Sequence, residues 1–521
     1  MKVALIAPPY PLSEMPSAPL GLCYVAAAFE SADAEVIILD YIVRKYTPEK
    51  LFNELSAFQP DIIGITSVTM NFNQAVSILK TAKTMFPEAI TVMGGPHVTF
   101  DYDDTLKENK EIDLIVIGEG EQTIMELVPL IRDREAWHTI KGIAYMDGDH
   151  VTVTPKRGFI KDIDSLPFPS RHLLPISRYL ALGLPISIIT SRGCPNRCIF
   201  CQGPLMVGKK IRNRDQKLVL DEIEMLLSYG FDRINFSDDF FTSNPKRVRQ
   251  FCEEISKRGL KFGWTVFARA DSVNVELLTL MRDHGCDMVF FGVESGNQEM
   301  LNRIRKHVTL DRIRKAVADC KTVGMPVFAS FIAGLPGESM DTLMDSENFA
   351  KELDVIYGYH FLAPFPGTDV KENIASYDLE LLTTDWSRFD ANAPITRTSS
   401  LSPEEIEDFV DTYFLGIYRR QDEMLEEKFK QGTLDDNEKV TYLGKKTLDI
   451  VFKLLTEDII DNLPSIAMNE SGKSPEVYLS EAISNVIEYP PDQILMSIQH
   501  MMHYRSLKYT TEGSNVCWQW A

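Results

Sequence analysis

Short apolar strands alternate with helices twice along this chain, and this alternation constrains the fold more than any other feature of the sequence. The first series begins at Val3–Ala7 and ends near residue 135. The second begins near Pro185 and has longer helices. Such alternation predicts parallel sheets covered by helices. At 521 residues the chain is also long enough for several domains.

The first series predicts an α/β domain with a flavodoxin-like, Rossmann-like sheet. Ligands of such sheets bind at the carboxyl ends of the strands. The expected strands are Val3–Ala7, Val36–Leu39, Ile62–Ile65, Ile90–Met93 and Leu114–Ile117.

The second series predicts a partial (β/α)6 TIM barrel, whose chemistry gathers at the carboxyl ends of its strands. The expected strands are Ile186–Ile189, Arg233–Phe236, Thr265–Phe267, Met288–Gly292, Val327–Ile332 and Tyr359–Leu362.

Three cysteines, Cys194, Cys198 and Cys201, follow the first strand of the second series with C-x3-C-x2-C spacing. Thiolates are soft ligands, and one short loop can turn three sulfurs toward an iron–sulfur cluster. A [4Fe-4S] cluster normally takes four cysteines, so three leave one iron open for substrate chemistry. The alternatives are a zinc site or a chance cluster, but no second ligand pair or nearby histidine completes a zinc site.

With Phe200 as the aromatic residue, the cysteine loop resembles that of the radical S-adenosylmethionine (SAM) superfamily. Three further motifs resemble those of the family at matching strand ends: Phe-Ser-Asp-Asp-Phe-Phe from 236, Val-Glu-Ser-Gly from 293 and Gly-Leu-Pro-Gly-Glu from 334. The resemblance implies that SAM chelates the open iron and is cleaved to a 5′-deoxyadenosyl radical. The implied SAM-binding residues are Phe200, Asp239, Arg269, Glu294 and Ser295. The acid pair at 238–239 is equally compatible with helix caps.

The strand ends of the first series resemble those of the cobalamin-binding domain that precedes many radical SAM domains. Gly-Gly-Pro-His begins at 94 and Gly-Glu-Gly-Glu at 118, although tight turns alone also favour glycine. None of the nine histidines lies in a D-x-H-x-x-G pattern, so the resemblance implies no such histidine beneath cobalt. We expect His97 near the corrin or its tail. The implied cobalamin-binding residues are Gly21, Ser67, Thr69, Gly94, Gly95, His97, Gly118, Glu119 and Gly120.

Four regions follow: a cobalamin-binding domain at 1–140, a linker at 141–180, the partial barrel at 181–375 and a helical C-terminal domain at 376–521. The linker contains an expected hairpin near 144–153. In the last region, a capping box at Ser402 starts a helix with one apolar face, and further helices are expected at 439–455, 475–486 and 492–503. The end, with Cys517, Trp518 and Trp520, is expected to form an aromatic tail that docks on the barrel.

The formal charge of −21 disfavours binding to nucleic acid or to anionic lipid, because both require a basic face. We see no apolar run long enough for a membrane span and no signal peptide. Eight cysteines in a chain of this length do not indicate a disulfide framework. The expected setting is therefore the reducing cytoplasm.

The resemblance implies a cobalamin-dependent radical SAM methyltransferase that methylates an unactivated carbon through a 5′-deoxyadenosyl radical and methylcobalamin. Its cofactors are a [4Fe-4S] cluster, SAM and cobalamin, and its reductant is flavodoxin-like or ferredoxin-like. The acceptor is a small molecule, a peptide or a protein, and the acidic surface and helical C-terminal domain favour a peptide or protein side chain. The alternatives are a cyclase or rearrangement enzyme without net methyl transfer, and a non-catalytic cobalamin carrier or sensor. The carrier hypothesis leaves the cysteine loop unexplained.

Overall fold

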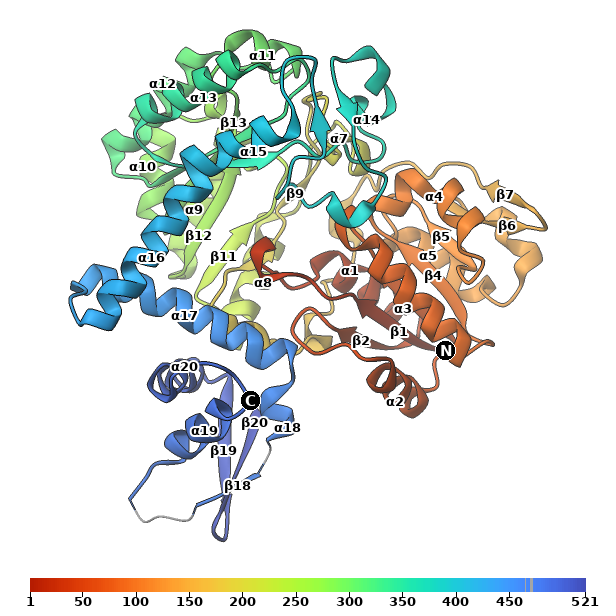
Figure 1. The fold of residues 1–521 in the computed structure, drawn as a ribbon. Coiled ribbons are helices and arrows are strands. Elements are labelled where there is room, and N and C mark those ends of the chain that lie inside the picture. The colour runs from red at the N-terminus through yellow and green to blue at the C-terminus, as the bar shows by residue number, and fades with distance from the viewer. Residues whose placement is uncertain (464, 469–471) are drawn as a thin grey trace.

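The structure is a computed structural model that describes residues 1–463, 465–468 and 472–521. It contains two sheets of mainly parallel strands, each covered by helices, and a C-terminal region that lies beside both (Figure 1). Among the described residues, no helix combines the length and the apolar character that crossing a bilayer requires.

The N-terminal sheet has the order β2-β1-β3-β4-β5, which confirms the predicted flavodoxin-like topology. Both faces of this sheet are buried, because successive residues of a strand point to opposite faces and each face has its own apolar core. On β1, Leu5 belongs to the core that contains Leu22 and Ile124. Its neighbour Ile6 belongs to the core that contains Leu51 and Leu79. The strands are β1 (Lys2–Ala7), β2 (Glu35–Asp40), β3 (Ile62–Thr66), β4 (Ile90–Gly94) and β5 (Leu114–Val116). The helices are α1 (Leu20–Glu30), α2 (Pro48–Phe58), α3 (Phe72–Met85), α4 (Pro96–Glu108) and α5 (Glu121–Leu127).

The predicted hairpin is present, but it belongs to the N-terminal sheet and not to a free connector. Strand β6 (Ile143–Asp147) pairs antiparallel with β5, and β7 (His150–Val153) pairs with β6. The strand β6 is apolar, and pairing with β5 removes it from water: Ile143 and Ala144 are fully buried there.

The second sheet is the predicted partial barrel, with all strands parallel and in the order β15-β14-β13-β12-β11-β8. The register between β13 and β14 shifts between Gly292 and Glu294, which turns the end of β13. The strands are β8 (Ile186–Ile188), β11 (Arg233–Phe236), β12 (Gly263–Ala268), β13 (Cys286–Glu294), β14 (Val327–Ala333) and β15 (Ile356–Phe361). The helices are α8 (Gln216–Tyr229), α9 (Pro245–Arg258), α10 (Val275–Asp283), α11 (Gln298–Arg303), α12 (Leu310–Val323), α13 (Met340–Leu353) and α14 (Asp369–Glu372). Short pairs β9 (Ser191–Arg192) with β10 (Arg212–Asn213) and β16 (Glu380–Leu381) with β17 (Thr396–Arg397) lie outside the sheet.

The C-terminal region is helical, as predicted, but it also contains a small antiparallel sheet that we did not predict. The expected aromatic tail is a strand of this sheet, in which Val516 and Trp518 are buried. The strands are β18 (Ser465–Ala467), β19 (Leu507–Glu512) and β20 (Asn515–Trp520). The helices are α15 (Pro403–Val410), a π-helical turn (Asp411–Leu415), α16 (Gly416–Gln431), α17 (Asp436–Thr456), α18 (Ile459–Asn462), α19 (Pro475–Ser484) and α20 (Pro491–His503).

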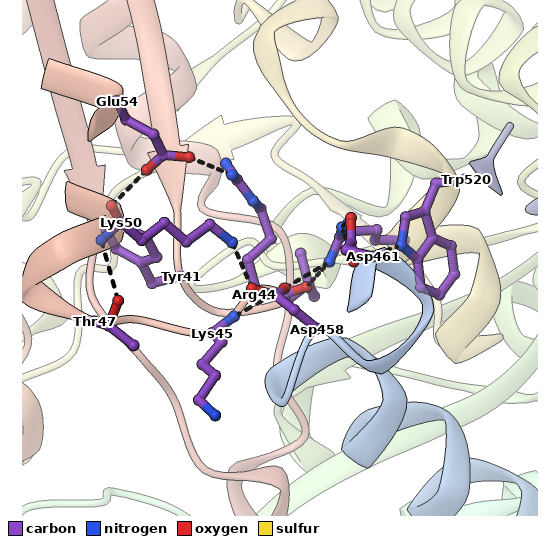
Figure 2. Close-up of polar contacts among 11 residues, drawn as sticks. Tyr41, Arg44, Lys45, Thr47, Lys50, Glu54, Asp458, Asp461 and Trp520 are labelled. Atoms are coloured by element: carbon purple, nitrogen blue, oxygen red, sulfur yellow. Dashed lines mark hydrogen bonds and ion pairs between the residues drawn. The ribbon is translucent and has the colours of Figure 1, made fainter. Parts of the chain in front are cut away.

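A polar cluster around Asp458 and Asp461 joins the C-terminal region to the N-terminal domain (Figure 2). The helix α6 (Ile176–Leu182) of the linker supplies its central cation, Arg178. Arg178 donates to both carboxylate oxygens of Asp461, at 2.6 and 2.8 Å, and to Asp458 at 3.3 Å. Lys50 of α2 lies 2.5 Å from Asp458. Trp520 donates to Asp461 at 3.2 Å and lies under the Arg178 guanidinium. The tail therefore docks on the linker and not on the barrel.

Candidate functional site

A cavity of about 290 Å³ opens at the carboxyl edge of the N-terminal sheet. Its floor is apolar, from Leu5, Val92 and Val116 on the strands and Leu22 and Val25 on α1. Three residues of the radical SAM-like half, from the cysteine loop and the short helix after it, complete the wall: Arg192, Met206 and Val207. The predicted residues in its lining are Gly21, Gly94, Gly95, Gly118, Glu119 and Gly120.

Gly95 sets the shape of the cavity rim. Its φ of 110° lies in the region that favours glycine, and an added Cβ would lie 2.4 Å from the backbone oxygen of Ser67. The Ser67 hydroxyl is buried and has no hydrogen-bond partner in the described chain, but Ser67 is not among the residues that line the cavity. An apolar slot with a bare backbone rim fits part of a large cofactor such as cobalamin, whose benzimidazole ring is apolar and whose corrin edge carries amide groups that can meet backbone.

The other predicted residues of this group lie elsewhere. His97 is fully buried on α4, where its ring lies 4.0 Å from that of Phe72 and 4.9 Å from that of Trp386, so it is separated from the cavity. Thr69 is buried at the start of the turn that precedes α3 and is not part of the lining. Trp386 comes from a segment after the barrel, which covers this side of the domain.

The cysteine loop starts at β9, and two acids hold it in place. Asp238 accepts hydrogen bonds from the Thr190 amide at 2.5 Å and from the Thr190 and Ser191 hydroxyls at 2.6 and 2.7 Å. Asp239 accepts from the Gly193 amide at 3.1 Å. Both acids follow β11, the second strand of the barrel. They therefore fix the cysteine loop, which follows β8, the first strand.

The three thiols lie close enough to influence one another electrostatically. The pKa of Cys201 is raised to about 11, mainly by burial, with smaller contributions from the neighbouring Cys198 and Cys194. Burial also raises the pKa of Cys198, whereas Lys306 and Arg269 lower it. Among the residues that the structure describes, no three histidine, cysteine or acidic side chains are grouped so that they could hold a single metal ion. Three soft donors on one short loop, next to two cations, suit the larger and anionic iron–sulfur cluster instead.

The SAM-binding candidates divide into residues that face the cysteines and residues that do not. Glu294 has a φ of 67° and accepts from Lys306 at 2.6 Å, and both side chains are buried near Cys198. Arg269 donates to Asp271 at 3.0 and 2.9 Å. Phe200 is half-buried and packs against the main core.

Ser295 is fully buried, and its hydroxyl lies 3.2 Å from that of Ser346 on α13. It therefore supports the fold of the loop and does not face the thiols. The sequence analysis missed Lys306, because nothing near it in the sequence marks it as the partner of Glu294.

One residue joins the cavity to the cysteine loop. Arg192, which directly precedes Gly193 and Cys194, donates to Glu119 at 3.0 Å and to Glu121 at 2.6 Å. All three side chains are less than a tenth exposed. The Glu119 carboxylate also accepts from Arg212 at 2.8 Å. The side chain of Glu119 therefore contacts the barrel domain. The carboxyl edge of the N-terminal sheet and the cysteine loop of the barrel face each other across this cluster.

Two family models match the chain. The B12 binding domain matches residues 13–128. The radical SAM superfamily matches residues 188–350.

Curated relatives match most of the chain. An uncharacterized methyltransferase of Pyrococcus horikoshii is 33% identical over 438 residues, which cover 82% of this chain and 95% of the relative. The anaerobic magnesium-protoporphyrin IX monomethyl ester cyclase of Cereibacter sphaeroides is 29% identical over 416 residues, which cover 77% of this chain and 67% of the relative.

A solved structure has the same fold. The radical SAM methyltransferase TsrM of Kitasatospora setae, with cobalamin and a [4Fe-4S] cluster bound, aligns with a TM-score of 0.65. The alignment covers 97% of this chain and 99% of TsrM at 17% identity.

Proposed function

This chain belongs to the family of cobalamin-dependent radical SAM methyltransferases, and on that premise we propose that it transfers a methyl group to a carbon that bears no activating group. Its cofactors are those of the family: cobalamin, a [4Fe-4S] cluster and SAM. When bound, they supply the methyl group and the radical that no side chain can generate.

We assign the cofactors to the two sites described above. Cys194, Cys198 and Cys201 would hold the cluster, and Glu294 would meet the SAM ammonium group in place of Lys306. The glycine-rimmed cavity would hold cobalamin, with the Ser67 backbone packed against Gly95 at its rim.

The observation that carries the proposal is the Arg192 cluster. A single buried arginine contacts the cavity loop through Glu119 and Glu121 and is two residues from Cys194. Two cofactors held by these edges are close neighbours, and an acceptor placed between them can meet both.

A cyclase or rearrangement enzyme is the second candidate, favoured by the similarity to the magnesium-protoporphyrin ester cyclase. A non-catalytic cobalamin carrier is disfavoured, because it has no use for three cysteines on one short loop. For the remaining partners we propose a flavodoxin-like or ferredoxin-like reductant and a cytoplasmic location, supported by eight free cysteines. A peptide or protein acceptor was our expectation from the acidic composition and the helical C-terminal domain.

The test is the stoichiometry of SAM products. The protein is reconstituted anaerobically with iron, sulfide and hydroxocobalamin, then given SAM with a deuterated methyl group and an extract that supplies the acceptor. We expect S-adenosylhomocysteine and 5′-deoxyadenosine in similar amounts and an extract compound that gains the labelled methyl group. Release of 5′-deoxyadenosine without S-adenosylhomocysteine would contradict methyl transfer and favour the cyclase.

A further inference from the structure

Three phenylalanines form a row across the middle of the barrel sheet. Phe267, Phe290 and Phe328 lie at the same register on β12, β13 and β14. Their ring centroids are 5.2 and 5.5 Å apart. We call these residues the aromatic row. On the next strand, Ile356 pairs with Phe328 and extends the apolar surface.

The aromatic row is on the face of the sheet that the barrel helices do not cover. Trp264 and Val266 alternate with Phe267 along β12 and are fully buried, and Trp264 packs on Phe251 of α9. Phe267 points the opposite way and is 48% exposed. Exposed apolar surface of this kind costs free energy in water and marks a binding site, so we expect a ligand to cover the row.

The row lies directly below the residues assigned to SAM. Gly292 is two positions beyond Phe290 on the same face of β13, roughly 7 Å further along the strand. A Cβ on Gly292 would lie 2.5 Å from the Glu294 carboxylate and 2.9 Å from the Lys306 ammonium. Whatever covers the row therefore lies next to the residues assigned to SAM.

Both ends of this face are closed by other parts of the chain. At one end, Ser17 of the loop between β1 and α1 contacts Ser187 of β8 at 3.0 Å. At the other, Phe414 of the π-helical turn and Phe328 both lie against Gly358, within 3.0 Å of the place of an added Cβ. The N-terminal domain and the C-terminal region thus bound the same surface. π-Helical turns are frequent at functional sites, and this one brings Phe414 to the end of the row.

The middle of this face is apolar, and its polar residues lie around the row, with Ser330 of β14 and the exposed His360 of β15 beyond it on the same face. Asn235 and Thr265 hydrogen-bond each other at 3.0 Å beside the row. The charged residues at the borders of this face form ion pairs. Arg233 pairs with Asp287 at 2.9 Å near the amino ends of the strands, and Glu294 pairs with Lys306 near the carboxyl ends. No ring of the row can satisfy an amide N–H or C=O of a peptide main chain, and leaving such groups unpaired costs free energy.

We infer that the acceptor is a small molecule with a flat, largely apolar ring system, which lies on the aromatic row and presents a carbon to the reaction centre above it. This inference rests on the proposed function for the identity of that centre. It replaces the peptide or protein acceptor expected from the acidic composition, because overall charge describes the outer surface and not the inner face of the barrel.

The test measures binding without turnover. The full chain, with its cluster reconstituted, is dialysed to equilibrium against 1-pyrenemethanol, a flat and uncharged fused-ring alcohol, or against a capped Gly-Ser peptide. We expect the pyrene to bind and the peptide not to bind. Phe267→Ala and Phe290→Ala should each weaken pyrene binding about tenfold, because an aromatic contact and its buried area are lost. Phe267→Leu, which keeps apolar volume without the ring, should give a smaller loss.

Phe52→Ala is the matched control. Phe52 is 47% exposed and also has one aromatic neighbour, Phe86 at 6.1 Å, but it lies on α2. Iron content and melting temperature show whether each variant is folded. Unchanged pyrene affinity in both folded row variants, no pyrene binding at all, or binding of the peptide alone would each overturn the inference. A protein that binds pyrene through the row yet transfers no methyl group would instead refute only the proposed function.

Discussion

The cavity of the N-terminal domain and the cysteine loop of the barrel occupy equivalent places in two parallel sheets, yet they are built from different groups. The cavity consists of apolar side chains and bare backbone, with glycine where the chain comes closest. The cysteine site consists of thiols, the Glu294–Lys306 pair and Arg269. A large, rigid ligand can be selected by shape, whereas a small charged ligand needs specific partners. The same sheet edge thus supports recognition by shape in one domain and by charge in the other.

The sharpest way to break this comparison is to remove one thiol. Cys198→Ala should abolish the iron–sulfur absorbance and all SAM cleavage, because two thiolates are too few to anchor an open cluster. Cobalamin affinity should stay unchanged, because the cavity wall contains none of the three cysteines. Absorbance spectra and equilibrium dialysis measure the two outcomes. Cys252→Ser, at a buried thiol on α9, is the control and should retain the cluster. Full cluster content in the Cys198 variant would refute the assignment.

The reciprocal change tests recognition by shape. Gly95→Val should weaken cobalamin binding at least a hundredfold, because its Cβ would meet the Ser67 backbone and its φ is disfavoured for valine. The cluster should remain. Gly21→Ala also changes the cavity lining, but nothing lies within 4 Å of the added Cβ, so we expect a severalfold effect at most. Equal losses in both variants would show that the rim does not depend on close backbone approach.

A third change removes the cation that joins the two sites. Arg192→Gln leaves Glu119 with Arg212 alone and leaves buried Glu121 without its cation, which should cost about 3–5 kcal/mol of unfolding free energy. Chemical denaturation measures this loss. The exposed pair of Arg132 with Asp61 supplies the control, since Arg132→Gln should change stability by about 0–1 kcal/mol. A stable Arg192 variant with separate, intact cofactor sites would show that the cluster is not the joint between the domains.

The smallest expected effect concerns a carboxyl group that neither site uses. Burial raises the pKa of Glu338 to about 8, although it accepts hydrogen bonds from the Gly334 and Leu335 amides. The folded chain therefore keeps this proton up to about pH 8, whereas the unfolded chain releases it near its ordinary pKa of 4.5. Stability contributed by Glu338 is present at low pH and is lost as the pH rises through that window.

Glu338→Gln keeps a neutral acceptor for both amides and has no proton to lose. We expect its melting temperature to fall less than that of the wild type between pH 6 and pH 8.5, as measured by scanning calorimetry. The exposed Glu404→Gln, in the first turn of α15, should leave the pH dependence as it is. Parallel curves for Glu338→Gln and the wild type would mean that Glu338 is ionised in the fold.

The sequence predicted features that depend on neighbouring residues, and it missed contacts between residues that are far apart along the chain. The cysteine loop, Gly95 and the strand orders depend on local patterns, and both sheet topologies were predicted correctly. Lys306 and the Arg192 cluster were missed, because their partners are 12 and 71 residues away. His97 follows two glycines at a strand end, but Trp386, a residue 289 positions further on, helps to bury it. Strands β18 to β20 alternate weakly and follow helices, so no local signal separated them from tail and loop.

The polar cluster around Arg178 limits how the domains can rotate against each other. Two bodies joined at one point can still rotate about it, and the Arg192 cluster alone would be such a point. The second attachment, through Asp458, Asp461 and Trp520, lies far from the first along the chain and involves the C-terminal region (Figure 2). A displacement of about 1 Å between reacting groups can cost roughly a hundredfold in rate. The second attachment therefore limits how far the two cofactor sites can move relative to each other. Changes in the last strand would then alter how often radical formation ends in product, without changing any residue that touches a cofactor.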